Sequence, residues 1–509
     1  MPAPTHAHRT VHRIEPGDHV VVCGAGPAGL TAAYQLAKQD VPVTVLESDH
    51  VVGGISRTVQ HDGYRFDLGG HRFFTRIAPV QAMWEELLGD DLLDVPRLSR
   101  IHYAGKFFHY PLRAGNALKG LGPRDAIRIL ASYARARLRP SPVEENFEQW
   151  VTNRFGRHLY EIFFKTYTEK VWGIPCTEIR AEWAAQRIQN LSLTRAVLSA
   201  NPLTRRAGDV RTLIDSFKYP RLGPGQMWER CRDRIVERGG EVRTGHRVTA
   251  LEVRDGRVVA ARVAGPDGEE RIEAQHVIST MPLDTLVAAL GDAATPDARA
   301  AASGLSFRAL LVVALVVDDE TPFPDNWIYV HTPHFRVGRV QNFRNWSAAL
   351  TPEPGRTCLG MEYFCTEGDD VWSLDDAALV QLATRELGAL GLAGGARVVD
   401  GVVVRVPKAY PVYDASYRAR VDVVRGCLDA IPNLHTVGRN GMHKYNNQDH
   451  SMYTAMLTVE NLCGASHDVW AVNTDSEYHE AQRVVPREAR RTGPAFVFGR
   501  AASRAPSEA

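Results

Sequence analysis

The stretch Val20-Val21-Val22-Cys23-Gly24-Ala25-Gly26-Pro27-Ala28-Gly29 decides the fold of this 509-residue chain. It is an apolar strand that enters a glycine-rich turn, and a helical pattern and a second apolar strand ending at Glu47 follow it. This order of strand, turn, helix, strand and acid is typical of a dinucleotide-binding βαβ unit. Gly24 allows the tight turn, Gly26 lets the backbone approach a pyrophosphate, and Gly29 lets the helix pack closely on the strand. The helix N-terminus would donate N–H groups to the pyrophosphate, and Glu47 would accept hydrogen bonds from a ribose diol.

A second glycine turn follows soon after the acid. It reads Gly53-Gly54-Ile55-Ser56-Arg57, and Asp67-Leu68-Gly69-Gly70-His71 comes ten residues later. Two ordinary loops would also explain these glycines. A glycine turn this close to the ribose acid nevertheless resembles the extended FAD fingerprint of glutathione-reductase and amine-oxidase type flavoproteins. The resemblance implies FAD as cofactor and an α/β fold with a Rossmann-type, glutathione-reductase-like FAD domain.

Composition excludes several classes of protein. The formal net charge is +1, so no overall field would attract the chain to nucleic acid. The longest apolar run, residues 309–317, is about half of what a membrane-spanning helix needs. The seven cysteines are scattered without a C-x-x-C pair, which argues against a zinc site or a disulfide scaffold and fits a reducing cytoplasm. We therefore expect a cytoplasmic enzyme with no metal and no membrane span, with homo-oligomerisation left open.

The pattern along the chain predicts a discontinuous FAD domain with two insertions. A helical insert and a β-sheet substrate domain interrupt it. Predicted strands include 241–244, 247–253, 257–263, 277–280, 310–317, 327–330, 337–343 and 358–364, and predicted helices include 227–237, 375–390 and 449–463. We expect these boundaries: flexible leader 1–18, FAD-binding segments 19–105, 219–304 and 406–470, helical insert 106–218, substrate sheet 305–405, flexible tail 471–509.

One predicted helix in the insert, residues 125–138, has a clear apolar periodicity. Ile127, Leu130, Ala134 and Leu138 recur at helical spacing, which predicts a helix with an apolar stripe. Its arginines would then lie mostly on a polar face. A solvated polar face explains them more simply than a helix lying on a membrane surface.

Four motifs together resemble one enzyme family. They are Asp67-Leu68-Gly69-Gly70-His71, Lys170-Val171-Trp172-Gly173-Ile174-Pro175, Trp183-Ala184-Ala185-Gln186-Arg187 and Asn447-Gln448-Asp449-His450-Ser451. The combination resembles the UDP-galactopyranose mutases in their eukaryotic-type pattern, over roughly residues 19–465. The wider relatives are the protoporphyrinogen-oxidase-like and amine-oxidase-like flavoproteins.

That resemblance implies an isomerase that uses flavin without net oxidation. In the family, N5 of the reduced flavin attacks the anomeric carbon of an NDP-hexose, and the nucleoside diphosphate leaves and returns. A pyranose thereby becomes a furanose, as with UDP-galactose and its galactofuranose isomer. The implied cofactor is FAD in the reduced form FADH⁻, with an external reductant such as NAD(P)H, and the implied partner is a nucleotide sugar.

The resemblance also implies the residues that hold the substrate. Arg187, in its Trp-x-x-x-Arg context, matches an arginine that binds the diphosphate. A second arginine would be Arg336 or Arg339, whose odd spacing on a strand points them to opposite faces, and the count back from Asn342 slightly favours Arg336. The remaining candidates are aromatic or polar: Trp327 and Tyr329, Tyr410 with Tyr413 as its alternative, Tyr445, and Asn447. Only Asn446 separates Tyr445 from Asn447, fewer residues than is usual in the family, which leaves the position of Tyr445 open.

His71 matches a histidine whose backbone approaches flavin N5, so we assign it to cofactor positioning, with an ordinary loop histidine as the alternative. Arg439 would offset pyrophosphate charge. The full set expected to bind the cofactor is Gly24, Gly26, Pro27, Ala28, Gly29, Glu47, Ser48, Gly54, Ile55, Ser56, Arg57, Gly70, His71, Val248, Gly438, Arg439, Asn447, Gln448 and Ser451.

Two other functions compete with the mutase. An FAD-dependent oxidase or desaturase of the protoporphyrinogen-oxidase or amine-oxidase type would pass hydride from its substrate to oxidised flavin, in an apolar slot. A non-catalytic Rab-GDI-like binder would share the architecture without flavin, but the glycine turn and Glu47 speak against it. The arginine and tyrosine candidates favour the mutase over the oxidase.

Overall fold

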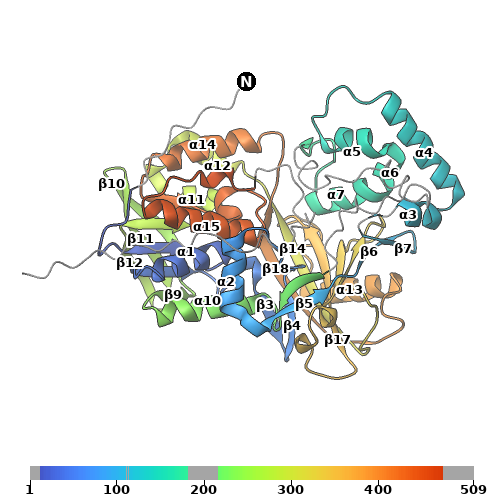
Figure 1. Ribbon diagram of the computed structural model, residues 1–509, viewed down its shortest axis with the longest axis horizontal. Helices are drawn as coiled ribbons and strands as arrows, with labels where there is room; N and C mark the ends of the chain where they lie inside the picture. Colours follow the sequence, from blue (N-terminus) through green and yellow to red (C-terminus); the bar gives the residue numbers. More distant parts are fainter. Residues whose placement is uncertain (1–11, 111, 113, 182–215, 474–509) are drawn as a thin grey trace, which may run out of the picture.

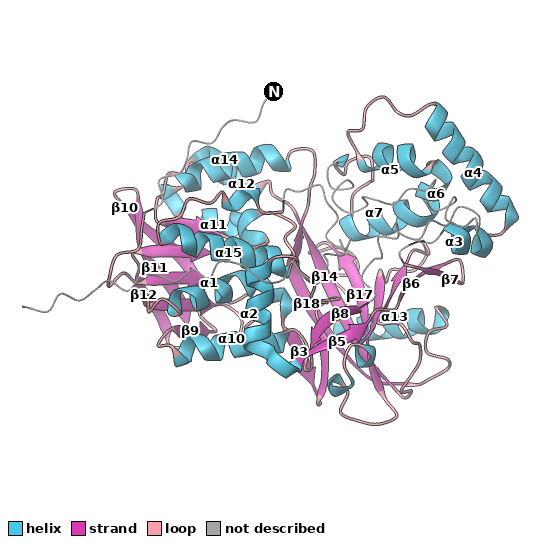
Figure 2. Ribbon diagram, in the orientation of Figure 1, coloured by secondary structure: helices cyan, strands magenta, loops and turns pink. Residues whose placement is uncertain are grey.

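The first half of the architecture is a parallel sheet that several chain segments build together. The computed structural model describes residues 12–110, 112, 114–181 and 216–473 (Figures 1 and 2). Its five-stranded sheet has the order β19–β13–β1–β2–β9, and all neighbouring strands are parallel. The strands are β1 (Val20–Cys23), β2 (Val43–Glu47), β9 (Glu241–Thr244), β13 (His276–Ser279) and β19 (Leu434–Thr436).

Helices cover this sheet because its strands are apolar on both faces. The side chains of β1 are buried throughout, as expected of a parallel strand. On one face lie α1 (Pro27–Ala37), α2 (Ala78–Leu88), α10 (Gly225–Glu237) and α15 (Gln448–Leu462), packed around Trp84 and Trp228. The other face packs against a small sheet and further helices: β10 (Arg247–Arg254), β11 (Arg257–Gly265), β12 (Gly268–Glu273), α11 (Leu283–Ala289), α12 (Pro296–Ser303) and α14 (Tyr417–Asp429).

The second half is a seven-stranded sheet in the order β18–β14–β17–β16–β15–β6–β7. Its strands are β6 (Ser99–Tyr103), β7 (Lys106–His109), β14 (Phe307–Val317), β15 (Trp327–Val330), β16 (Arg339–Asn342), β17 (Thr357–Cys365) and β18 (Val398–Pro411). Only the β15/β6 pair is parallel. One face packs on α13 (Asp376–Ala389), and the other forms an aromatic cluster with β4 (Tyr64–Asp67) and β8 (Ser216–Pro220). β4 pairs with β3 (Thr58–His61), and β8 pairs with β5 (Leu92–Pro96).

A separate group of helices stands at one end of this sheet, beside β6 and β7 (Figure 1). It comprises α3 (Ala114–Leu121), α4 (Pro123–Leu138), α5 (Phe147–Phe155), α6 (Arg157–Tyr160) and α7 (Thr166–Trp172). Asn146 caps α5 by accepting a hydrogen bond from the N–H of Gln149 at 3.0 Å. Within the described ranges, each helix is too short or too polar to pass through a bilayer.

The structure confirms most predicted elements and corrects some boundaries. The predicted hairpin at Asp255-Gly256 is present, with φ values of 51° and 73° that suit a tight turn. The strand β6 begins before residue 105 but belongs to the seven-stranded sheet, so the boundary predicted there is wrong. The predicted leader is also ordered at its end, since the N–H of Ile14 donates to the carbonyl of Leu462 at 3.0 Å. Residues 1–11 and 474–509 lie outside the described part of the chain.

The helix predicted at 125–138 is present as α4, but its apolar stripe is not covered by the described residues. Ile127, Leu130 and Leu138 are exposed to 68%, 45% and 82%. The helix instead buries Ile129 and Ala136. Periodicity alone identified the helix correctly but could not tell which of its two apolar faces is covered.

The contact between β1 and α1 leads to a stability prediction. A Cβ at Gly29 would lie 1.9 Å from the carbonyl oxygen of Gly24, so Gly29→Ala should lower the free energy of unfolding by about 2 kcal/mol or more. Gly388→Ala in α13 is the matched control, because no atom lies within 4 Å of its added Cβ, and it should leave stability unchanged or raise it by about 0.5 kcal/mol. Chemical denaturation of both variants measures this. Equal stability of Gly29→Ala and the wild type would contradict the packing described.

Candidate active site

A bare backbone cradle lies where β1 meets α1. Gly24 has φ of +103°, and a Cβ there would lie 2.1 Å from Oγ1 of Thr280. Gly26 and Gly54 face each other so closely that a Cβ on Gly54 would lie 3.3 Å from Cα of Gly26. No described side chain caps α1, which begins at Pro27 and has no acid in its first turn. The N–H groups and positive dipole end of the helix are therefore available to an anion.

Glu47 is held at the end of β2 beside this cradle. Its Oε2 accepts a hydrogen bond from the N–H of Ala25 at 2.7 Å, and its Oε1 accepts from the N–H of Asp49 at 2.9 Å. The hydroxyl of Ser48 also donates to Oε1, at 3.3 Å. These bonds fix the carboxylate at the end of β2 beside the glycine turn, and its contact with a ribose stays a prediction.

The second glycine turn closes over the first. The N–H of Gly53 donates to the carbonyl of Ala25 at 2.8 Å, and residues Gly54–Ser56, which include Ile55, form a 3₁₀ turn. Arg57 leaves this turn to pair with Asp49, with Nη1 and Oδ2 at 2.9 Å. Arg57 therefore lies at the ribose-acid side of the cradle.

A third segment, from β19 to α15, forms the remaining side of the glycine cradle. Gly438 has φ of +88°, and a Cβ there would lie 3.0 Å from Cβ of Ala28. The Nε of Arg439 donates to the carbonyl of Asn446 at 2.8 Å, which directs its guanidinium toward the second sheet. At the start of α15, the N–H of Asn447 donates to Nδ1 of His450 at 3.3 Å, and Ser451 is buried.

These residues fit an FAD molecule. The glycine cradle has room for a pyrophosphate only because Cβ atoms are missing, and Oε1 of Gln448 is buried without a hydrogen-bond partner among the described residues. An isoalloxazine ring placed along α15 would give that oxygen a partner. Val248 packs its side chain into the apolar cluster beneath β2, so its predicted cofactor contact would have to come from its backbone.

Several of the predicted site residues lie together on one face of the seven-stranded sheet, on the side of the glycine cradle. The register places Tyr329 opposite Arg339, and Arg339 opposite Glu362. Glu362 is fully buried and accepts from Nε of Arg339 at 2.9 Å and from Nε2 of Gln341 at 2.7 Å. Burial opposes the charge of Arg339, but Glu362 more than compensates and holds the pKa of Arg339 well above its usual value.

Arg336 lies on the other side of the sheet. Its side chain is 58% exposed and pairs with Asp370, with Nη2 and Oδ2 at 2.6 Å. The strand β16 begins only at Arg339, so Arg336 lies in the loop before it and the alternation expected of two residues on one strand does not apply; the preference for Arg336 is not supported. Arg339 is the one that lies with the tyrosines.

The tyrosines predicted near the C-terminal end also face this space. The rings of Tyr410 and Tyr445 stack with centroids 5.8 Å apart, and the guanidinium of Arg439 lies 5.5 and 5.1 Å from them. Tyr413 lies just behind, where its hydroxyl accepts a hydrogen bond from the N–H of Tyr445 at 2.6 Å. The short spacing to Asn447 therefore does not displace Tyr445 from the cluster.

Helix α7 contributes residues that the sequence argument did not identify as ligands. Tyr167 stacks on His331 with centroids 4.7 Å apart and meets Tyr329 edge-on at 5.4 Å. Burial raises the pKa of Tyr167 well above its usual value. Trp172 lies 5.7 Å from the ring of Tyr445. Trp172 lies within the Lys170 motif, and Tyr167 precedes Lys170 by three residues, a spacing that places Tyr167 and Lys170 on one helix face and could have identified Tyr167.

Lys170 anchors this helix to the sheet. Its Nζ donates to the carbonyls of Val330 at 3.0 Å and Val337 at 3.1 Å. Burial lowers the pKa of Lys170 to about 8. The motif lysine thus fixes α7 to β15, and thereby the position of Tyr167 over Tyr329.

Two further arginines, also missed by sequence reasoning, flank Trp327. The guanidinium carbons of Arg72 and Arg97 lie 5.5 and 5.6 Å from its ring, and Arg97 lies 5.5 Å from the ring of Tyr110. Burial and Tyr110 raise the pKa of Tyr329, whereas the charges of Arg339, Arg72 and Arg97 oppose that increase. Arg72 directly follows His71, so its adjacency to the glycine motif was the available signal.

The loop that ends at His71 joins the cradle to this group of site residues. A Cβ on Gly69 would lie 3.6 Å from Nη2 of Arg339, and a Cβ on Gly70 would lie 3.0 Å from Nε2 of Gln341. Burial, with the nearby charges of Arg439 and Arg339, lowers the pKa of His71 to about 3. The imidazole is therefore neutral at physiological pH, which agrees with a positioning role rather than with proton transfer.

Asp67 anchors the start of the same loop. Its carboxylate accepts from the hydroxyl of Tyr219 at 2.6 Å and from that of Thr58 at 3.0 Å. Burial outweighs these hydrogen bonds and raises the pKa of Asp67 to about 7.

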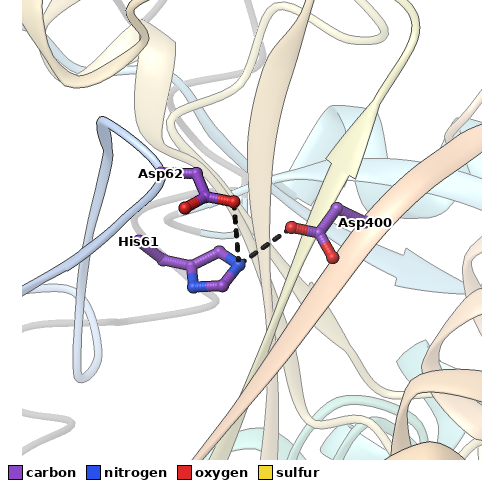
Figure 3. Close-up of side chains that lie close together, drawn as sticks. All are labelled: His61, Asp62 and Asp400. Atoms are coloured by element: carbon purple, nitrogen blue, oxygen red, sulfur yellow. Dashed lines mark hydrogen bonds and ion pairs between the residues drawn. The ribbon is translucent and has the colours of Figure 1, made fainter.

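Arg187 and its Trp183 motif lie outside the described residues, so their predicted contact with a diphosphate stays a prediction. A different cluster, His61 with Asp62 and Asp400, lies on the surface (Figure 3). Nε2 of His61 is 2.8 Å from Asp400 and 3.9 Å from Asp62. Because these side chains are largely exposed, we interpret them as an ion pair that joins β3 to β18.

Comparison with known proteins agrees with this architecture. The model of the family described as "Flavin containing amine oxidoreductase" matches residues 27–446. The "Probable UDP-galactopyranose mutase" of Klebsiella pneumoniae is 28% identical over 173 residues, which is 32% of this chain and only 43% of that protein. The "Coproporphyrinogen III oxidase" of Mycobacterium tuberculosis is 27% identical over 445 residues, covering 81% of this chain and 90% of that protein.

Solved structures show the same fold. A reduced UDP-galactopyranose mutase superposes with a TM-score of 0.78 at 21% identity, covering 90% of this chain and 97% of that one. A putative protoporphyrinogen oxidase from Exiguobacterium gives a TM-score of 0.66 at 19% identity, covering 88% and 100%. The fold is thus the mixed α/β, FAD-binding, amine-oxidase-like fold, and the finer description as glutathione-reductase-like stays a prediction.

The raised pKa of Asp67 predicts a pH dependence of stability. Between pH 3.8, its ordinary pKa, and about 7, the unfolded chain has lost this proton while the folded chain keeps it. The free energy of unfolding should therefore fall as the pH rises through this window, by about 1 kcal/mol per unit from this group. Asp67→Asn should remove that decline, which denaturation midpoints across a pH series would measure.

Asp400→Asn is the contrasting variant, because the hydrogen bond from His61 lowers the pKa of Asp400. The contribution of the Asp400 carboxylate to the free energy of unfolding should be lost as the pH falls. Parallel curves for wild type and Asp67→Asn would contradict the assignment of Asp67.

Proposed function

The chain belongs to the family of flavin containing amine oxidoreductases, and within this family we propose that it is an FAD-dependent nucleotide-sugar mutase. It would interconvert the pyranose and furanose forms of an NDP-hexose similar to UDP-galactose, as an isomerase acting in the cytoplasm. Arg339 carries the proposal, because it is a buried arginine surrounded by tyrosines beside the loop that ends at His71.

The demands of a diphosphate support this assignment. A nucleoside diphosphate that leaves and returns carries charge that must be held out of water, and arginine forks suit it best. Neutral hydroxyls can add hydrogen bonds without adding charge. Tyr167 and Tyr410 stay protonated because burial raises the pKa of both phenols. They would therefore act as donors to the phosphoryl oxygens beside Arg339.

Glu362 would keep Arg339 in place between turnovers. A buried guanidinium without a partner is costly, and the fork on Glu362 satisfies it. Arg72, Arg97 and Arg439 would supply the additional positive charge that the diphosphate needs, since each lies against an aromatic ring of the proposed site. In the proposed binding site, Glu362 therefore neutralises the charge of Arg339, and the other three arginines make the surrounding electrostatic potential positive.

The loop at Gly69 and Gly70 would bring the protein backbone to the flavin ring. Both glycines lie against side chains of β16, so the loop is held between the two sheets. Neutral His71 would contribute shape and hydrogen bonding there without adding charge. When bound, reduced FAD would supply the nucleophile, N5, for the anomeric carbon, and NAD(P)H is the proposed class of reductant.

The second candidate is an FAD-dependent oxidase of the protoporphyrinogen-oxidase or amine-oxidase type. The observation that favours it is the ion pair itself, because Glu362 cancels the charge of Arg339 and could leave the cavity suited to a less anionic substrate. The long match to a coproporphyrinogen III oxidase points the same way. A non-catalytic binder is disfavoured because the glycine turn, the uncapped start of α1 and Glu47 are all present together, as a dinucleotide site requires.

Anaerobic incubation with nucleotide hexoses separates these functions. Protein reduced with dithionite is mixed with UDP-, GDP- and dTDP-hexoses, and products are separated by chromatography. Isomers of unchanged mass, formed only with reduced flavin, would support the mutase. Turnover of a porphyrinogen or amine with oxidised flavin alone would favour the oxidase, and a colourless purified protein would favour the binder.

The two arginines on either side of the sheet provide a matched pair. Arg339→Lys keeps the charge but loses the two-pronged hydrogen bonds, so kcat/KM for the active nucleotide hexose should fall about 100-fold. Arg336→Lys lies on the exposed face and should change kcat/KM less than twofold, within the ordinary spread of surface substitutions. Flavin absorbance and thermal unfolding check that both variants fold. A larger loss in Arg336→Lys would reverse the assignment of the two arginines.

A further inference from the structure

Helix α4 has a large apolar stripe on its outer surface. Eight large apolar side chains are exposed in the described part of the chain, and four of them lie between residues 127 and 143. Ile127, Leu130 and Leu138 belong to α4, and Val143 follows it. Exposed apolar side chains gathered on one helix, rather than scattered singly, indicate an interaction site.

The stripe and the buried side of α4 lie on opposite faces. At about 100° per residue, Ile127, Ala134 and Leu138 fall within a narrow arc of the helix. Ile129 and Ala136, which pack against the insert, fall about 180° away. The stripe is therefore directed away from the molecule, and α4 forms the outer edge of the helical group in Figure 1.

Arginines border this stripe on both sides. Five arginines lie between residues 123 and 139, and the acid among them is Asp125. Asp125 is already shared between Arg128 at 3.7 Å and His158 at 3.2 Å. Arg128 is still 70% exposed. The outer surface of α4 thus combines exposed apolar side chains with a strong local excess of positive charge.

We propose that α4 binds the surface of an anionic lipid bilayer, with its apolar stripe in the interface and its arginines against the headgroups. This combination of an apolar face and flanking basic residues is what interfacial helices present. The proposal concerns where the protein acts and is independent of the reaction proposed above.

Charge selects the membrane over a second copy of the chain. A twofold contact through α4 would bring the same surface of each copy together. The arginines of one helix would then face the arginines of the other, with one acid on each side that already has partners. Anionic headgroups, by contrast, complement the arginines while the bilayer interface accepts the apolar side chains.

Vesicle flotation tests the proposal with the full-length FAD-loaded protein. Vesicles of phosphatidylcholine and phosphatidylglycerol in equal parts should carry the protein upward, whereas phosphatidylcholine alone should carry much less. Raising the salt from about 0.1 M to about 1 M should release much of the protein, since the Debye length falls from about 10 Å to about 3 Å.

Two substitution pairs separate the apolar and charged contributions. Ile127→Gln with Leu138→Gln should weaken partitioning at least about tenfold, because both side chains would otherwise enter the interface. Arg135→Gln with Arg137→Gln should weaken binding to anionic vesicles about fivefold per arginine and reduce the effect of salt. The matched control is Val236→Gln on α10, which is 54% exposed but whose neighbouring Arg232 and Arg234 are paired with Asp233 and Glu237, so that no excess of positive charge surrounds it.

Three outcomes would overturn the proposal. The first is no flotation with anionic vesicles at low salt, and the second is equal flotation of the α4 variants and the control. The third is a dimer in sedimentation velocity that Leu138→Gln dissociates, which would assign the face to a second copy. Far-ultraviolet circular dichroism and thermal unfolding establish that each variant is folded, so a loss of flotation reports on the surface.

Discussion

The buried pair of Arg339 and Glu362 is the interaction on which the candidate site depends. A fully buried carboxylate is tolerated only if donors surround it, and here one guanidinium fork and the amide of Gln341 supply them. The three side chains come from adjacent strands whose register places them on one face. Removing one partner would leave the other charged and unsatisfied, at a cost of several kcal/mol (about 3–5). The seven-stranded sheet therefore holds an arginine at a position where hydrophobic packing alone would exclude it.

The loop of residues 67–71 packs against this buried pair, and it ends at His71, where the flavin is proposed to lie. Its glycines lie against the side chains of β16, and its first residue, Asp67, is fixed by two hydroxyl donors from β3 and β8. Each contact is short-range, but together they fix both ends of this five-residue loop against β16, β3 and β8. A flavin resting on the glycine cradle would thus have a fixed distance to the arginine and tyrosine face. That geometry is what a bound sugar nucleotide would need, because reacting atoms must be held close and in line.

Local chemistry explains how much could be predicted from the sequence. The cradle was predictable because glycine, a helix start and an acid have fixed spacings within one βαβ unit. The choice between Arg336 and Arg339 was not predictable. Alternation along a strand assigns residues at odd spacing to opposite faces, but which face is covered depends on which strands become neighbours. Tyr167, Arg72 and Arg97 were missed for the same reason: they reach the cavity through strand and helix packing between distant segments. The strands 99–103 and 106–109 likewise join a sheet whose other members begin only at Phe307.

Helix α4 shows the limit of composition as a guide to partners. A net charge of +1 over the whole chain argues against a long-range field, yet it says nothing of how charges are distributed at short range. Screening restricts electrostatic recognition to about 10 Å at ordinary ionic strength, so a partner responds to the charges of one helix rather than to their sum over the protein. The periodicity of its apolar residues describes equally well a stripe that faces the core and one that faces outward. Only the positions of Ile129 and Ala136 decide between these orientations, because the face that packs inward determines the face that remains exposed.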